Sequence, residues 1–318
     1  MVLTLLVNPL SLICSQLMSS PDFLLTNLEL RASNPDGTEG AGLSHQTGGI
    51  GGAGMVLVRV LELGPPRSKG EPDGAAIVIH DVGDHGARYE ELAKELAAAG
   101  WMVSLPDMRG HGASEGARGH TPGVAEPVRD IHKVREHVAY RMPEAKSVVI
   151  GVGVGALWAM AYACAHQDEV HGLVLAAPLL DPKFGAPEKI GGMLGMFKKI
   201  ETLSPCAISW KASDLFADGA DQAAWSGDSG CVKSVSKGAV DAITATLQSA
   251  PAAYAALGKP ALVLAGSDDP LTTPAAAQAL AEKLGATCEV IEGARHSIFQ
   301  GTSADRAVAK VVEWLAAN

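Results

Sequence analysis

Two side chains near the C-terminus have the types and the spacing of an acid–base pair. Asp269 follows the apolar run at 260–265, and His296 follows the next such run, at 287–291. If both runs are parallel strands, the two side chains stand at the same edge of a sheet, where α/β proteins place their functional groups. A carboxylate that orients an imidazole is the arrangement used in general-base catalysis. We therefore expect Asp269 and His296 to contact each other.

A glycine-rich turn lies between a predicted strand and a predicted helix. The sequence GVGVG at 151–155 connects an apolar run to an alanine-rich stretch. In a strand–turn–helix of this kind, the central residue is lifted above the sheet towards the histidine. Here that residue is Gly153, which has no side chain to lift. Cys164, the GDSG sequence at 227–230 and Ser267 are the other candidates, and none lies where it would replace a missing nucleophile.

A third segment with chemical potential begins at His80, directly after the apolar run 75–80. A loop in this place can aim backbone N–H groups at the negative oxygen of a reaction intermediate. Asp81 is out of place in such a loop, because its carboxylate would repel the charge that the loop should stabilise unless it points away. We expect His80 and Asp81 to line the pocket.

The segments that position these residues alternate between two patterns. Short apolar runs are typical of buried parallel strands, and stretches with apolar residues every three or four positions are typical of helices. This alternation indicates a parallel sheet covered on both faces. The expected strands are 55–63, 75–80, 101–105, 147–150, 171–176, 260–265 and 287–291, and the expected helices are 89–99, 124–142, 155–166, 274–284 and 304–317.

The same patterns divide the chain into an extension, a core and an insertion. Residues 1–54 include a stretch rich in Gly, Ser, Asn and Asp, and we expect them to be a disordered N-terminal extension. Residues 55–180 and 258–318 are expected to form the core. Residues 181–257 break the alternation and are too long for a simple crossover, so we expect an inserted helical cap or lid.

The cap contains a set of apolar residues that one helix face would bring together. One interpretation is that these residues pack on a core of their own, and the other is that they form a lipid-facing lid or an acyl-chain tunnel. The six residues are Ile190, Met193, Leu194, Phe197, Ile200 and Leu203.

From about residue 55 onward, the chain resembles one branch of the α/β-hydrolase fold. The segments that carry the resemblance are 80–89, 107–116, 151–156 and 266–269, together with His296. They are similar to the motifs of the monoacylglycerol lipase and lysophospholipase branch, of the serine aminopeptidase S33 type. The resemblance implies a mostly parallel sheet flanked by helices, an inserted helical cap, acyl-ester hydrolysis and no cofactor.

The resemblance also assigns roles to individual residues. The family's acid and base fall on Asp269 and His296, and its nucleophilic serine falls on Gly153. The histidine and methionine that flank this serine in the family fall on Val152 and Val154. The nucleophile is thus absent, while the acid and the base remain.

The oxyanion-hole donors implied by the resemblance are the backbone N–H groups of Val82 and Val154. Backbone donors survive side-chain changes if the turn keeps its shape. The glycine that follows the loop histidine in the family falls on Asp81, and the glutamate of the same loop falls on Asp84.

Two functions follow from this pattern. In the first, the chain is a degenerate member that lacks the catalytic serine and binds a small hydrophobic or acyl-chain ligand, or a protein, in the old pocket. In the second, it is an active hydrolase or lyase in which Asp269 and His296 activate water or the substrate directly. The space left at Gly153 would hold that water. The ligand's identity stays open in both.

Charge and composition exclude other classes of function. The formal net charge is −10, and the longest basic pairing is Lys198-Lys199, so we expect no nucleic-acid partner. The five cysteines show no CxxC spacing, the ten histidines show no HExxH, and His132 and His137 are interpreted as surface residues. We therefore expect no metal site and no disulfide framework.

The remaining expectations concern location and assembly. A chain without a disulfide framework suits a reducing compartment, which favours the cytoplasm. Residues 1–20 are apolar but lack Lys and Arg, so a targeting segment there is the alternative. The cap is the candidate for a peripheral membrane contact. The oligomeric state is left open.

Overall fold

The computed structural model describes residues 25–32, 56–66, 70–189 and 201–318. Most of the N-terminal extension lies outside the described residues. So do Lys198-Lys199 and five of the six apolar cap residues; the sixth, Leu203, is half-buried.

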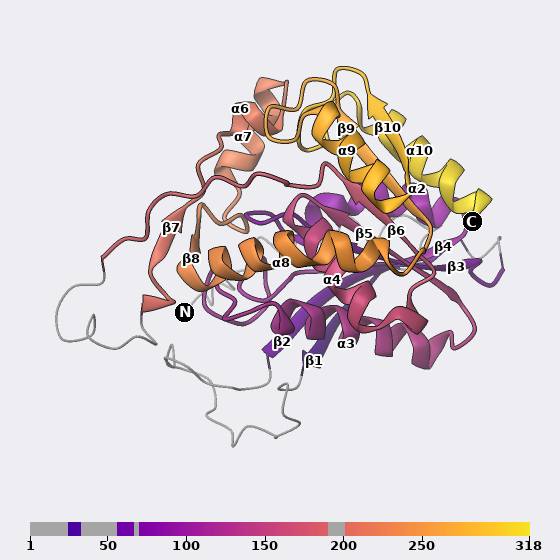
Figure 1. Cartoon of the computed structure of the whole chain (residues 1–318). Coiled ribbons are helices and arrows are strands. Elements are labelled where there is room, and N and C mark those ends of the chain that lie inside the picture. Colours follow the sequence, from indigo (N-terminus) through magenta and orange to yellow (C-terminus); the bar gives the residue numbers. More distant parts are fainter. Residues whose placement is uncertain (1–24, 33–55, 67–69, 190–200) are drawn as a thin grey trace, which may run out of the picture.

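A mixed sheet of eight strands forms the centre of the described chain (Figure 1). The strands lie in the order β1-β2-β4-β3-β5-β6-β9-β10, and every pair from β4 to β10 is parallel, whereas β2 is antiparallel to both of its neighbours. The predicted α/β-hydrolase fold is thus confirmed. The strand bounds are β1 Leu25–Ala32, β2 Val56–Leu63, β3 Gly74–Ile79, β4 Trp101–Pro106, β5 Lys146–Val152, β6 Gly172–Ala176, β9 Ala261–Gly266 and β10 Thr287–Ile291.

Helices cover both faces of the sheet, as buried parallel strands require. One apolar core lies between the sheet and α3, α4, α8 and α9, and a second lies between the sheet and α2 and α10. The helix bounds are α2 Glu90–Ala98, α3 Ala125–Arg141, α4 Val154–Ala165, α8 Lys237–Ala255, α9 Pro274–Leu284 and α10 Ala304–Ala317, with the 3₁₀ turns η2 Gly86–Tyr89 and η3 Gln167–Glu169.

Strand β1 corrects one expectation. Residues 1–54 were expected to be disordered throughout, yet Leu25–Ala32 pairs with β2 along its whole length, from Leu25 opposite Leu63 to Ala32 opposite Val56. The unpaired edge of β2 provides backbone partners for this strand, so its order depends on the sheet rather than on its own apolar content.

The region 181–257 contains more than helices. Its helices are α6 Ala212–Leu215, α7 Gly219–Gly227 and α8, and β7 Pro205–Ala207 pairs with β8 Ser234–Ser236 in a small antiparallel sheet. Three-residue strands are too short to show an alternating pattern, which explains why the sequence did not indicate them. Helix α8 packs against α4 of the core.

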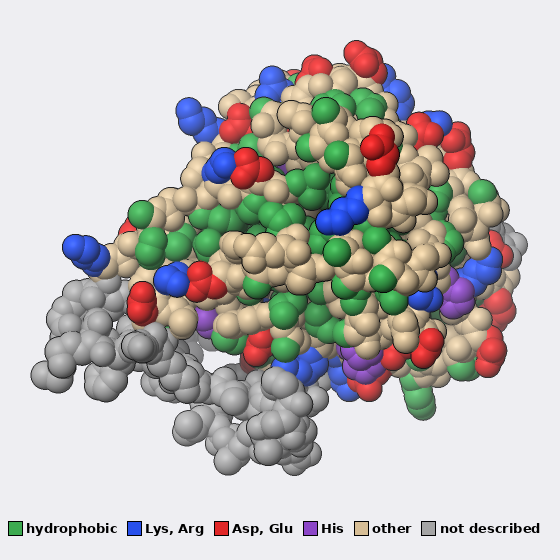
Figure 2. Space-filling model, in the orientation of Figure 1, with side chains coloured by type: hydrophobic (Ala, Val, Ile, Leu, Met, Phe, Trp, Pro, Cys, Tyr) green, Lys and Arg blue, Asp and Glu red, His purple; other side chains and the backbone are tan. Residues whose placement is uncertain are grey.

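Hydrophobic side chains gather in a hollow above α8 on the face shown in Figure 2. Lys and Arg side chains are scattered on this face among acidic ones. Between residues 180 and 257, the half-buried residues that pack on the core include Leu180, Phe184, Ile208 and Leu247. Among the described residues, no helix combines the length and the hydropathy needed to cross a membrane.

A buried ion pair joins the loop after β4 to α3. Arg109 donates two hydrogen bonds to Asp130, from Nε at 2.7 Å and from Nη2 at 2.6 Å, and the Asp130 side chain is fully buried. We predict that Asp130→Ala lowers the free energy of unfolding by about 3–5 kcal/mol, because it leaves the guanidinium buried without a counter-charge. Urea unfolding followed by circular dichroism measures this loss.

The matched control is Glu91→Ala, which breaks an exposed ion pair with Lys94. That change should cost at most about 1 kcal/mol. Equal losses in the two variants would contradict the importance of the buried pair.

Candidate functional site

Gly153 occupies a sharp turn between β5 and α4. Its backbone has φ 57° and ψ −119°, a conformation that side chains disfavour. Two positions later, a Cβ on Gly155 would lie 2.3 Å from the carbonyl oxygen of Ile79. The glycines of this turn therefore let the first turn of α4 approach the end of β3.

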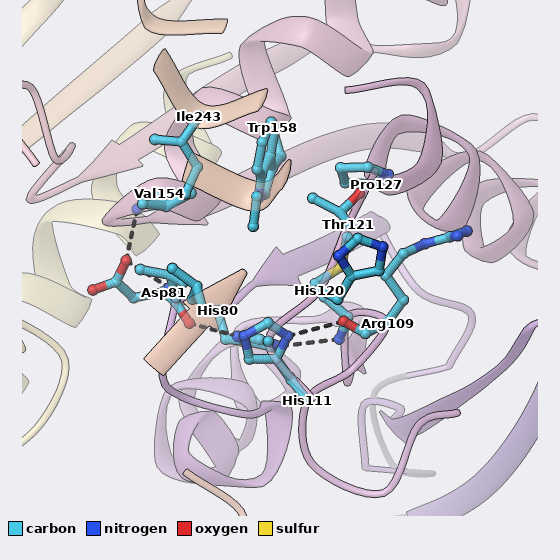
Figure 3. Close-up of a pocket in the computed structure, with 15 residues that line it drawn as sticks. His80, Asp81, Arg109, His111, His120, Thr121, Pro127, Val154, Trp158 and Ile243 are labelled. Atoms are coloured by element: carbon cyan, nitrogen blue, oxygen red, sulfur yellow. Dashed lines mark hydrogen bonds between the residues drawn. The ribbon is translucent and has the colours of Figure 1, made fainter. Parts of the chain in front are cut away.

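The Asp81 carboxylate points into this turn. Its Oδ1 accepts hydrogen bonds from the backbone N–H groups of Val82 and Val154, both at 2.7 Å, and Asp81 is 6% exposed (Figure 3). Val154 is the first residue of α4, so the positive end of the helix dipole adds to the attraction. Both backbone groups that the sequence marked as oxyanion donors are thus paired with a side chain of the chain itself.

Asp81 and the turn at Gly153 fit each other closely. A Cβ built on Gly153 would lie 2.1 Å from Asp81 Cγ and 2.1 Å from Asp81 Oδ1. Real Cβ atoms do not approach other atoms so closely. The carboxylate therefore occupies space that any side chain at position 153 would need.

Asp269 and His296 are brought together as expected. His296 Nδ1 lies 2.8 Å from Asp269 Oδ2, and both side chains are almost completely buried. Asp269 Oδ1 accepts hydrogen bonds from the N–H groups of Leu271 and Thr272, at 2.7 and 3.0 Å. These bonds fix the carboxylate, so the predicted contact is confirmed, while the catalytic role of the pair stays a prediction.

The other nitrogen of His296 faces a second carboxylate. His296 Nε2 lies 3.5 Å from Asp81 Oδ2, within ion-pair range but long for a hydrogen bond. Burial alone would lower the pKa of His296, but Asp269 and Asp81 together outweigh it and raise the pKa to about 10. His296 is therefore an imidazolium at neutral pH.

His80 holds the loop that carries Asp81. Its Nδ1 lies 2.7 Å from the carbonyl oxygen of Asp81, which only accepts, and its Nε2 accepts a hydrogen bond from Met108 N–H at 2.9 Å. In the neutral imidazole, Nδ1 donates one hydrogen bond and Nε2 accepts the other. Burial, aided by the neighbouring His111, holds the pKa of His80 well below its usual value, so it remains neutral.

A small cavity of ≈ 30 Å³, partly open to solvent, lies beside this site (Figure 3). His80 and Asp81 line it, as predicted, and so does His111. His111 Nδ1 lies 3.0 Å from the carbonyl oxygen of Arg109 and therefore carries the proton, while its buried Nε2 makes no hydrogen bond to the described residues. The apolar wall comes from Trp158, Val235, Ala239 and Ile243.

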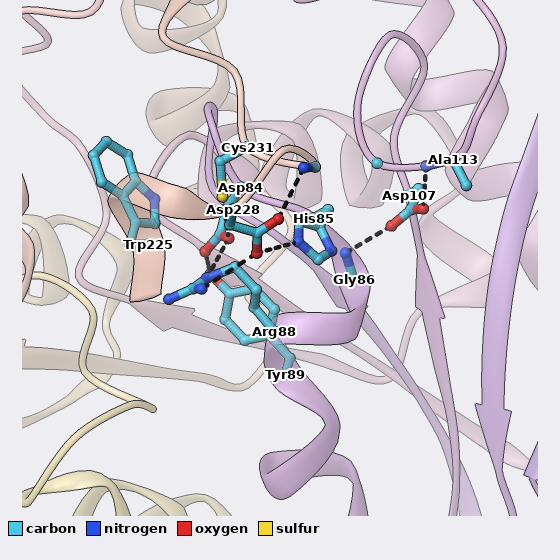
Figure 4. A network of polar contacts seen from close by, with 12 residues as sticks. Asp84, His85, Gly86, Arg88, Tyr89, Asp107, Ala113, Trp225, Asp228 and Cys231 are labelled. Atoms are coloured by element: carbon cyan, nitrogen blue, oxygen red, sulfur yellow. Dashed lines mark hydrogen bonds and ion pairs between the residues drawn. The ribbon is translucent and has the colours of Figure 1, made fainter. Parts of the chain in front are cut away.

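The same loop is tied to the cap by a polar network (Figure 4). His85 Nε2 lies 2.9 Å from Asp228 Oδ2, and Arg88 pairs with Asp84 at 2.8 Å and with Asp228 at 3.5 Å. The Tyr89 hydroxyl also donates to Asp84. Burial raises the pKa of Asp84 to about 6, against the lowering effect of Arg88, His85 and Tyr89. The loop is thus tied to the cap by ion pairs and hydrogen bonds.

Sequence reasoning identified the members of this site but not its central contact. Gly153 and Asp81 both depart from the motifs that the sequence resembles, and the available signal for their contact was that the two departures occur together. Cap residues such as Asp228 carried no signal, because their partners lie more than 100 positions away in the sequence.

Comparison with known proteins places this geometry in a family. The model of the family described as "Serine aminopeptidase, S33" matches residues 70–302. The chain belongs to this family. It is 26% identical over 283 residues to the monoacylglycerol lipase of Mycolicibacterium smegmatis, a match that covers 86% of this chain and 97% of the relative.

Two solved structures share the fold. A monoacylglycerol lipase of Paleococcus ferrophilus aligns with a TM-score of 0.68 at 24% identity, covering 82% of this chain and 98% of the other. A soluble variant of the monoglyceride lipase of Saccharomyces cerevisiae, in complex with a substrate analogue, aligns with a TM-score of 0.70 at 18% identity, covering 89% and 98%. The chain is thus a monoacylglycerol lipase-like α/β hydrolase in its fold and family.

The two carboxylates around His296 predict a pH-dependent stability. Because the pKa of His296 is about 10 in the folded protein and 6.5 in the unfolded chain, the folded form holds its proton more tightly. The resulting stabilisation is complete below pH 6.5 and is lost as the pH rises to 10, by up to about 1.4 kcal/mol per pH unit. Urea unfolding at intervals from pH 6 to 10 measures it.

The control is Asp81→Asn, which keeps an oxygen for the two N–H donors but removes the negative charge. The pKa of His296 should fall in this variant, so its stability should decrease less between pH 7 and 10 than that of the wild type. Identical pH profiles would show that Asp81 does not act on His296.

Proposed function

We propose that this chain is a non-hydrolytic member of its family that binds a hydrophobic acyl-chain ligand, with Gly153 at the position of the nucleophile. The observation that carries the proposal is the Asp81 carboxylate, which takes both backbone N–H groups at 2.7 Å. In serine acyl transfer, donors of this kind stabilise the oxygen of the tetrahedral intermediate. Here the Asp81 carboxylate accepts hydrogen bonds from both donors instead.

A substrate carbonyl oxygen competes poorly with the Asp81 carboxylate for the two backbone N–H donors. Hydrogen bonds from N–H groups to a carboxylate are about twice as strong as those to a neutral oxygen. Displacing Asp81 from its two donors would also leave a buried negative charge without hydrogen-bond partners next to the turn. An ester therefore gains too little at the donors to displace the carboxylate.

The absent side chain at 153 and the carboxylate of Asp81 support the same conclusion. Without a hydroxyl or thiol at 153, no covalent acyl intermediate forms at the turn. Asp81 fits because the space at Gly153 is free, as the distance of 2.1 Å to a built Cβ indicates. The two departures from the family pattern are thus sterically coupled.

The competing function is a hydrolase or lyase in which Asp269 and His296 activate water or the substrate. The intact Asp269–His296 contact of 2.8 Å favours it. The charge on His296 opposes it, because an imidazolium has no free lone pair with which to take a proton. Turnover of monoacylglycerol that is abolished by His296→Ala would identify this second function.

The lining of the cavity suits an amphipathic ligand, and at ≈ 30 Å³ the cavity must widen to admit an acyl chain. Its apolar wall suits an acyl chain, and the unpaired Nε2 of His111 suits a hydroxyl donor. Burial lowers the pKa of His111, so this nitrogen is available as an acceptor at neutral pH. A monoacylglycerol has both parts, and relatives of this chain are named for that lipid class.

We predict that Gly153→Ser alone gains no esterase activity, whereas Gly153→Ser combined with Asp81→Gly does. The single variant places a side chain against Asp81 and leaves the N–H donors occupied, while the double variant frees both. A triad serine is worth about 10⁶ in kcat, so even a partly restored site should exceed the wild type by at least about 10²-fold. Hydrolysis of p-nitrophenyl esters and labelling by a fluorophosphonate measure the gain.

Asp81→Gly alone is the matched control, since it opens the donors without supplying a nucleophile and should remain unlabelled. If Gly153→Ser alone were labelled as well as the double variant, the proposed block by Asp81 would be wrong.

Ligand binding can be followed through Trp158, which lines the cavity and is 7% exposed. We predict that an ether analogue of a monoacylglycerol changes the tryptophan fluorescence of the wild type and that Trp158→Phe removes most of this change. Trp225→Phe serves as the control, because Trp225 is equally buried but is not part of the cavity wall. A signal that depends on Trp225 instead would place the ligand elsewhere.

A further inference from the structure

A cluster of metal-ligating side chains lies outside the cavity, where α3 meets the end of α4. His132 comes from α3, His166 directly follows α4, and Glu169 belongs to η3. We propose that His132, His166 and Glu169 form a binding site for a divalent transition-metal ion of the class of Zn²⁺. Two imidazoles and one carboxylate are a donor set that such ions accept.

Two distances between donor atoms match those of tetrahedral coordination, each to a different oxygen of Glu169. His132 Nδ1 lies 3.3 Å from Glu169 Oε2, and His166 Nδ1 lies 3.4 Å from Glu169 Oε1. Two ligands at Zn–N and Zn–O distances of 2.0–2.1 Å and a tetrahedral angle are separated by about 3.4 Å. One donor atom from each of the three residues lies within 4.8 Å of the other two.

His132 has a nitrogen that its protein neighbours leave unsatisfied. Its Nδ1 is shielded from solvent and makes no hydrogen bond to the described residues, although Glu169 is near. A buried polar atom without a partner is costly and calls for an explanation. A metal ion between His132 and Glu169 would give this nitrogen its partner.

Two hydrogen bonds hold Glu169 in place. The Tyr162 hydroxyl donates a hydrogen bond of 2.8 Å to Glu169 Oε2, and Arg135 Nε donates to the Glu169 carbonyl oxygen at 3.4 Å. Hydrogen bonds from neighbouring residues to the ligands of a metal orient those ligands and commonly accompany metal sites. Glu169 is thus positioned by residues of both helices, α4 and α3.

One adjustment is needed for both histidines to bind the same ion. Their rings are stacked, with centroids 4.0 Å apart and planes 15° from parallel, so the lone pairs do not yet converge. The side chains of His132 and His166 are 28% and 26% exposed. This exposure leaves room for a ring to turn and gives an ion a path from solvent.

A second cluster, at His85, Asp228 and Cys231, is less suited to a metal (Figure 4). Arg88 lies 3.5 Å from Asp228 and supplies the positive charge there. Burial, with help from Asp84 and Asp228, raises the pKa of the Cys231 thiol to about 12, whereas metals bind the thiolate. This contrast makes the two clusters distinguishable by experiment.

The experiment is a titration of the full, tag-free chain with Zn²⁺ against a chromophoric chelator, together with the melting temperature. We expect one Zn²⁺ per chain and a raised Tm in the wild type. His132→Ala and Glu169→Gln should each weaken binding more than tenfold, and Tyr162→Phe should weaken it by about tenfold. Circular dichroism of each metal-free variant checks that it is folded.

Two variants serve as controls. His137→Ala removes a histidine of the same helix that lies near Glu62 instead, and Cys231→Ser removes the thiol of the second cluster. Both should bind Zn²⁺ like the wild type, and the Co²⁺-loaded protein should show visible d–d bands without a thiolate charge-transfer band. Absence of Zn²⁺ binding, unchanged affinity in His132→Ala, or a thiolate band would overturn the proposal.

Discussion

The structure of the site depends on the groups that compensate the buried carboxylate of Asp81. Asp81 is satisfied on one oxygen by two backbone N–H groups and faces the imidazolium of His296 with the other. A buried charge persists only when it is compensated in this way. The turn at Gly153 and the N-terminus of α4 provide part of that compensation, and His296, whose charge also depends on Asp269, provides the rest.

The scaffold supplies these partners from separate parts of the chain. Strand β3 leads into Asp81, β5 and α4 enclose the turn, and the loops after β9 and β10 bring Asp269 and His296 to the same edge of the sheet. On the other side of the loop, Arg88 and His85 connect it to Asp228 of the cap. The carboxylate is thus held by the common architecture of the fold rather than by local sequence alone.

The sequence predicted whatever depends on pattern and order. Most strands and helices began and ended within a few residues of their predicted positions, and the contact between Asp269 and His296 followed from their place after consecutive strands. The direction of the Asp81 side chain was not predictable, because it depends on the space that a residue 72 positions later leaves free. The cluster at His132 was missed for a similar reason: only the packing of α3 against α4 brings His132 to His166 and Glu169, which are three residues apart in the sequence.

The close fit between positions 81 and 153 has a consequence for variants of this chain. A side chain at 153 would place a Cβ 2.1 Å from the carboxyl carbon of Asp81, so the two side chains cannot share the present arrangement. A residue with a side chain can enter position 153 only if the Asp81 carboxylate leaves the turn or is removed, whereas glycine at 153 leaves position 81 free to carry a carboxylate.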